Sequence, residues 1–188
     1  MSEVLHAKVT ESEKHGISRR RVVAGVAWSL PVIATAIAAP AAAASAVPAT
    51  VTWGLIGAAA ATGSSGSLTV QAPTTFDIQT GTAFTGSSVS YTVTILADRS
   101  EQSSKVEITS VSPGTGTSSI GQGADKATTF AGTLTTTPGS HLLRVALAGF
   151  KYTKPNKAGA YTYTVTLTVT IGGTTLTPAV STLAITFP

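Results

Sequence analysis

The sequence contains no cysteine in 188 residues. This absence excludes disulfides, catalytic thiols, zinc–thiolate centres and iron–sulfur clusters. Charged residues are also scarce, at 11% of the chain, and only three histidines are present. The stability of the fold must therefore come from packing, and acid–base or metal chemistry has few side chains to draw on.

The positive charge is concentrated at the N-terminus. The formal net charge is +4, but five of the twelve Lys and Arg residues and three of the eight acids lie before residue 22. The rest of the chain carries seven basic against five acidic residues, a net charge of about +2 that is scattered along the sequence. This balance does not favour binding to nucleic acid or to another polyanion.

The first 44 residues have the layout of an export signal. A polar segment is followed by 18 uncharged residues, Val22 to Ala39. The polar segment ends in the four residues of the targeting motif: Ser18, Arg19, Arg20 and Arg21. We expect this segment to be helical and to be removed on export. The alternative is a retained signal anchor, because about 18 apolar residues are at the lower limit for spanning a bilayer.

Residues 40–46 provide the cleavage region. Small residues at Ala42 and Ala44 match the A-x-A pattern that signal peptidase accepts. Cleavage is therefore expected between Ala44 and Ser45, with cleavage after Ala46 as the alternative. The mature chain, residues 45–188, has the length of a single domain. It would contact the membrane only through the uncleaved signal.

The segment from Ser18 to Ala24 resembles a twin-arginine leader, whose pattern is Ser/Thr-Arg-Arg-x-Phe-Leu-Lys. The arginine pair matches, while Val22 replaces the phenylalanine and Ala24 the lysine, so the Sec route is the alternative. The alanine-rich stretch from Arg20 to Ala34 is also similar to leaders of secreted actinobacterial surface proteins. This resemblance covers the leader only. It implies a secreted protein that is exported after it has folded.

Alternation of apolar and polar residues is clearest from Tyr161 to Ile171. The odd positions are aromatic or aliphatic, and the even positions are all threonine. A period of two predicts a strand with one buried and one solvated face, and threonine maintains β-propensity on the solvated side. Shorter runs of this kind raise the expected total to about eight strands: Val51–Ile56, Leu68–Ala72, Val89–Ile95, Val106–Ile108, Phe130–Leu134, Leu143–Leu147 and Leu183–Phe187.

Clusters of Gly, Ser, Pro and Thr predict loops between these strands, at 63–67, 79–88, 112–124 and 136–140. Gly172-Gly173 suits a two-residue hairpin turn, and Pro178 should confine the last strand to an edge or a bulge. No helical period follows the leader. The expected fold is all-β, an antiparallel immunoglobulin-like β-sandwich of about seven to nine strands, and Tyr161 is similar to the tyrosine corner of such folds.

Catalytic chemistry has little support. His141 is the one histidine after the leader, and a triad with Asp98 or Asp125 is left open although no Gly-x-Ser-x-Gly elbow is present. Paired glycosidase carboxylates would have to come from Asp77, Asp98, Glu101, Glu107 and Asp125. Asp98 and Glu101 are the candidates for calcium, but Arg99 lies between them. We expect no catalytic residue, no metal and no cofactor.

The most distinctive loop runs from Lys151 to Lys157. Three lysines, Lys151, Lys154 and Lys157, surround Tyr152 in this segment. The combination favours contact with an anionic envelope polymer or with an acidic patch on a partner. The alternative is an ordinary solvated hairpin loop.

These patterns predict a secreted, non-enzymatic structural or adhesion module that contacts the cell envelope, or a second copy of itself, without covalent bonds. Strand edges rich in Thr and Ser favour pairing between copies. The alternative is a glycan- or small-ligand-binding secreted module that uses loop aromatics such as Tyr152, Trp53 or Phe150. Buried aromatic side chains would favour the first function, and an exposed cluster of them the second.

Overall fold

The computed structural model describes residues 48–98, 104–120 and 127–188. These residues belong to one compact unit that spans Val47–Pro188. Several predictions fall outside the described residues: the signal motif at Ser18, Arg19, Arg20 and Arg21, the cleavage residues Ala42, Ala44 and Ser45, and the acids Glu101 and Asp125. Within the described part, no helix has the length and hydropathy needed to cross a bilayer.

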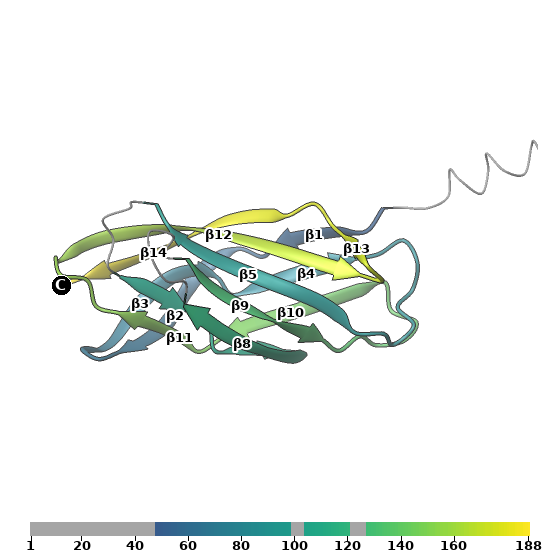
Figure 1. The fold of residues 1–188 in the computed structure, drawn as a ribbon, viewed down its shortest axis with the longest axis horizontal. Helices are drawn as coiled ribbons and strands as arrows, with labels where there is room; N and C mark the ends of the chain where they lie inside the picture. The colour runs from purple at the N-terminus through teal and green to yellow at the C-terminus, as the bar shows by residue number, and fades with distance from the viewer. Residues whose placement is uncertain (1–47, 99–103, 121–126) are drawn as a thin grey trace, which may run out of the picture. The chain divides into compact units, whose positions relative to one another are not determined.

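The described residues form fourteen strands in two sheets (Figure 1). The smaller sheet has the order β1 (Thr50–Trp53), β4 (Thr75–Gln79), β10 (Leu142–Ala148), β7 (Ser110–Ser112). The larger sheet has the order β6 (Lys105–Glu107), β11 (Phe150–Thr153), β2 (Ile56–Gly63), β3 (Gly66–Pro73), β14 (Ala179–Phe187), β12 (Gly159–Ile171), β5 (Val89–Ala97), β9 (Thr128–Leu134), β8 (Gly114–Ile120), and β13 (Thr174–Thr175) pairs with β12.

Seven of these strands have the order of an immunoglobulin constant-type sandwich. β1, β4, β10 and β7 take the places of strands A, B, E and D, and β5, β12 and β14 those of C, F and G. The other strands are insertions between these seven. All described strand pairs are antiparallel except β11 with β2. The all-β, immunoglobulin-like sandwich predicted from the sequence is thus confirmed, but the expected seven to nine strands are too few, because the inserted strands raise the total in the described residues to fourteen.

The alternation predicted for 161–171 is also confirmed in β12. Tyr163, Val165, Leu167 and Val169 are buried, and the threonines between them are partly exposed. β12 pairs with β5 on one side and with β14 on the other, so its buried face belongs to the core that the two sheets share. Burial of each large apolar side chain stabilises the fold by about 1.5–3 kcal/mol.

Two of the local features predicted around β12 are present, the tyrosine corner and the hairpin turn. The Tyr161 hydroxyl donates to the carbonyl oxygen of Lys157 at 2.9 Å, the backbone hydrogen bond that defines a tyrosine corner. Gly172 and Gly173 have φ values of 55° and 84°, as a tight primed hairpin turn requires. The prediction that Pro178 confines the last strand to an edge or a bulge was wrong. Pro178 lies in the break before β14, and β14 itself pairs with β12 on one side and with β3 on the other.

Two further local predictions were wrong. Residues 112–124 are predicted to be a loop, but Gly114–Ile120 form β8. Val51–Ile56 is predicted to be one strand, but the chain breaks at Gly54, where it passes so close to β4 that an added Cβ would lie 2.1 Å from Thr75 Oγ1. β1 and β2 therefore enter different sheets.

β8 can form a strand because the side chain of Tyr91, from β5, fills the space beside its glycines. Gly116 faces Gly132 of β9, and Gly132 in turn faces Tyr91 of β5. The Tyr91 hydroxyl reaches across and donates to the carbonyl oxygen of Thr115 at 3.3 Å. Burial raises the pKa of Tyr91 to about 12, so the hydroxyl remains a donor at neutral pH.

We predict that Gly132→Ala lowers the free energy of unfolding by about 1–3 kcal/mol, the usual cost of overpacking. The added Cβ would lie 2.0 Å from the Thr115 carbonyl oxygen, and backbone cannot move aside as a flexible side chain can. Gly57→Ala is the matched control, because a Cβ at Gly57 meets nothing within 4 Å. Urea unfolding measures both. Equal stability of the two variants would contradict the packing described for β8 and β9.

Candidate functional site

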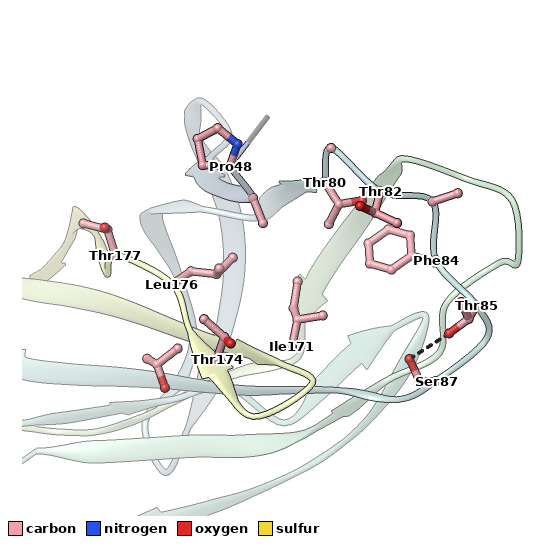
Figure 2. A pocket seen from close by; sticks show the side chains of 14 residues that line it. Pro48, Thr80, Thr82, Phe84, Thr85, Ser87, Ile171, Thr174, Leu176 and Thr177 are labelled. Atoms are coloured by element: carbon pink, nitrogen blue, oxygen red, sulfur yellow. Dashed lines mark hydrogen bonds between the residues drawn. The ribbon is translucent and has the colours of Figure 1, made fainter. Parts of the chain in front are cut away.

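A hollow of about 580 Å³ lies where β4 leads into β5 and β12 leads into β14 (Figure 2). Its walls come from three segments: residues 80–87, residues 171–177, and Pro48 with Ala49. In the immunoglobulin order, the first two segments belong to the B–C and F–G connections, which carry binding loops in variable domains. The hollow is therefore the candidate site of the described part.

The lining is apolar and hydroxyl-bearing, without a charged side chain. Phe84, Ile171 and Leu176 are the large apolar side chains of the lining (Figure 2). The hydroxyl groups belong to Thr80, Thr82, Thr85, Ser87, Thr174, Thr175 and Thr177. Such a surface suits an uncharged ligand, since it offers neither an ion-pair partner nor a titratable group.

Backbone hydrogen bonds hold one wall of the hollow in place. The amide of Phe84 donates to the Ser140 carbonyl at 2.8 Å, and the amide of Gly139 donates back to the Phe84 carbonyl at 2.9 Å. The Thr136 hydroxyl donates to the Ser87 carbonyl at 2.8 Å. The loop is thus held before any ligand arrives, which reduces the entropy lost on binding.

His141 lies beside this wall, and its ring contacts the backbone of the wall. Its ring Nδ1 is 3.1 Å from the carbonyl oxygen of Thr80. The hollow lies at the start of β5, whereas Asp98 follows its last residue. β5 has nine residues and extends about 30 Å, so Asp98 lies far from His141. The Asp98 carboxylate instead accepts a hydrogen bond from Thr164 at 2.9 Å. Of the two triads considered, the one with Asp98 is therefore excluded by geometry, and Asp125 lies outside the described residues.

The acidic side chains of the described part are dispersed, and no three His, Asp or Glu residues there gather into a metal-binding group. Asp77 on β4 faces Arg144 on β10, and their side chains form a bidentate ion pair with Nε–Oδ1 2.9 Å and Nη2–Oδ2 2.8 Å. The hydrogen bond from Arg144 lowers the pKa of Asp77 below its ordinary 3.8 and outweighs the opposing desolvation. This pair is a cross-strand contact on the sheet surface.

The predicted lysine loop is divided by the structure. Phe150–Thr153 form β11, and Tyr152 is buried, with its hydroxyl donating to the Gly66 carbonyl at 3.0 Å. Lys151 is exposed on β11, and Lys154 and Lys157 are exposed in the loop that follows. The prediction that Tyr152 belongs to a binding loop is thus wrong, because β11 pairs with β2 and β6 and directs this side chain inward. The three lysines remain available.

The other aromatic residues named as candidate ligand contacts are also used within the fold. Phe150 is buried. Trp53 packs edge-on against Phe76 at a centroid distance of 5.7 Å, and its indole N–H donates to the Ala179 carbonyl at 3.0 Å. Trp53, Phe150 and Tyr152 therefore do not form an exposed platform on which a sugar ring could stack.

The sequence did not single out the hollow. Its threonines lie in segments that read as ordinary turns, and threonine is abundant throughout the chain. One residue could have indicated the hollow. Phe84 is a large apolar residue in the middle of the turn cluster at 79–88, and such a side chain needs a surface to pack against. Phe84 is buried in the structure.

Comparison with known proteins gives no match to this chain, whether with family models, curated proteins or solved structures.

We predict that the stabilising effect of the Asp77–Arg144 pair disappears in acid. Because the pKa of Asp77 is lower in the folded state, the pair stabilises the fold above about pH 4, and this contribution is lost as the pH falls through the folded pKa. Arg144→Gln should thus lower the urea midpoint slightly at pH 7 and not at pH 2, the effect being small because the Arg144 side chain is 71% exposed.

Lys154→Gln removes an exposed positive charge from a loop that contains no acidic residue, and it serves as the control. Its midpoint relative to the parent chain should not depend on pH over this range. A constant difference between Arg144→Gln and the parent from pH 7 to pH 2 would contradict the assignment.

Proposed function

We propose that this chain is a secreted, non-enzymatic structural or adhesion module that acts outside the cell through noncovalent contacts. Export is supported by the twin-arginine-like motif at Ser18–Arg21 and by the small residues at Ala42 and Ala44. Contact partners would be a second copy of the chain or a polymer of the cell envelope. This is a role in which surface and shape matter more than reactive side chains.

The placement of the aromatic side chains carries the proposal. Tyr91, Phe130, Tyr152 and Tyr163 are buried, and the polar groups of the tyrosines are bound within the fold. A module that recognises sugars usually presents such rings to solvent, since they supply large contact areas at little entropic cost. Here they stabilise the sandwich instead, as a structural module requires.

The exposed lysines support contact with the envelope. Lys151, Lys154 and Lys157 lie on β11 and the loop after it, all exposed. A small group of positive charges attracts an anionic wall polymer with a strength that falls as salt is added. Envelope contact through these residues is therefore expected to be reversible.

We predict that the mature protein, beginning at Ser45 or at Val47, is found mainly in the envelope fraction of the producing cells and is released by high salt. Intact-mass measurement on the envelope and medium fractions checks this. Replacing the three lysines with glutamine should shift the protein to the medium, while its intact mass still corresponds to the same processed N-terminus. A freely secreted monomer, unaffected by salt or by the lysine changes, would contradict the proposed function.

The export route is tested in the same fractions. Replacing Arg19 and Arg20 with lysine keeps the charge but removes the arginine pair that resembles a twin-arginine motif. Retention of the uncleaved chain inside the cell is expected. Unchanged export would assign the leader to the Sec route and leave the extracellular role intact.

A second candidate function is binding of an uncharged small ligand or glycan in the hollow. Its volume of about 580 Å³ is within the range of small-molecule sites, and its lining combines Phe84, Ile171 and Leu176 with threonine hydroxyls. These groups suit a ligand with an apolar body and several hydroxyls. The hollow, rather than an aromatic platform, is the observation that favours this alternative.

We predict that neutral mono- and disaccharides, if they bind, perturb amide NMR signals of residues 80–87 and 171–177. Thr174→Arg should abolish these changes, because Thr174 lines the hollow and arginine would fill it. Thr182→Arg, which places the same side chain on the exposed face of β14, is the control. Changes that spread over other surfaces, or that survive in Thr174→Arg, would exclude the hollow as the site.

A further inference from the structure

Most strand edges in the described part carry a feature that prevents pairing with another chain. β1 has four residues and lies against β14, and β13 has two. β6 has three residues, of which Lys105 and Glu107 are charged. β7 has three residues and is followed by Pro113. Short strands, charges and prolines are the usual means by which proteins protect an open edge.

β8 differs from these strands in length and in charge, although Pro113 directly precedes it and β7 lies close to it. It has seven residues, without a charge or a proline. Among the described strands it pairs only with β9, at one end of the larger sheet, where Figure 1 shows it. Side-chain bonds hold it from its inner face, where Tyr91 donates to Thr115 and Ser118 donates to the carbonyl of Ile108. No other described strand forms backbone pairs with β8, so its second edge is the one available for pairing.

We propose that β8 pairs in antiparallel fashion with β8 of a second copy, across a twofold axis. This inference rests on the proposed structural role and names the contact through which two copies meet. Full overlap of two seven-residue strands places Thr117 opposite Thr117 of the second copy, and Thr115 opposite Ser119. A twofold contact needs a surface that fits itself, and an antiparallel pair of identical strands meets that condition.

The side chains of β8 suit this arrangement. The outward positions Thr115, Thr117 and Ser119 are exposed hydroxyl residues, so hydroxyls face hydroxyls across the axis and no like charges meet. On the inward face, Ile120 is 39% exposed at the edge. In the proposed register it lies opposite Gly114 of the second copy, which has no side chain to obstruct it. Pairing therefore covers an apolar side chain that the single copy leaves partly open.

Light scattering after size exclusion, from roughly 1 μM to roughly 1 mM, tests the contact, because weak complexes dissociate in this range. The full chain is exported and processed by its own leader, then purified. We expect a dimer that forms as the concentration rises. Thr117→Lys should stay monomeric throughout, because two lysines would meet at the axis. Thr182→Lys, with the same added charge on the exposed face of β14, should dimerise as the parent chain does.

Disulfide trapping tests the register, and the chain has no cysteine of its own to interfere. Thr117→Cys should form a covalent dimer on mild oxidation, since facing residues of an antiparallel pair lie within disulfide range. Thr115→Cys should not cross-link to itself, because its two copies would be about 14 Å apart, four residues along the strand. Thr115→Cys mixed with Ser119→Cys should cross-link.

The outcomes separate this inference from the proposed function. A parent chain that is monomeric over the whole range, or a Thr117→Lys variant that dimerises normally, overturns pairing through β8. The proposed function is judged independently by the envelope and medium fractions. If Thr117→Lys fails to fold, shown by loss of cooperative unfolding, the cysteine pairs decide instead: cross-linking of Thr117→Cys supports the contact, and its absence refutes it.

Discussion

The buried face of β12 is the constraint on which the rest of this structure depends. Tyr163, Val165, Leu167 and Val169 point into the space between the sheets, while β5 and β14 pair with the strand on its two sides. A shift of one residue in either register would bring the threonines of β12 into the core. The register of the central strands is therefore fixed by burial, and the loops at their ends are placed as a consequence.

The hollow at the end of the sandwich follows from that placement. Ile171, the last residue of β12, and Leu176, after the hairpin turn, form one wall of it. The loop that contains Phe84 forms another and is tied to Ser140 through backbone hydrogen bonds. The core thus fixes the positions of the two loops that line the hollow. The lining has no charged side chain, in keeping with the low content of charged residues in the whole chain.

Local sequence patterns predicted the parts of the fold that local patterns determine. The alternation from Tyr161 to Ile171, the turn at Gly172-Gly173 and the tyrosine corner each depend on residues within a few positions of one another. The same reasoning identified the sandwich class, because five of the seven framework strands (β1, β5, β10, β12 and β14) contain predicted alternating runs, whereas β4 and β7 were not predicted. It also identified the exposed lysines Lys151, Lys154 and Lys157.

Features that depend on distant segments were not predictable in this way. β8 is a strand because Tyr91, on β5, packs where Gly116 and Gly132 leave room, and nothing near Gly116 in the sequence indicates this. Tyr152 is buried because β11 pairs with β2 and β6, which lie far from it in the chain. The hollow was missed for the same reason, since its walls are separated by about 90 residues.

The composition of β8 is explained only in part by the core. Gly114, Gly116 and Ser118 must be small, because other segments approach this inner face closely. The outward positions, Thr115, Thr117 and Ser119, are exposed and are under no such restriction. A lysine at any of them would protect the edge without disturbing a core contact, as the charged residues of β6 do. Packing therefore accounts for the glycines of β8, but the uncharged outer face requires a different explanation, and pairing with another strand supplies one.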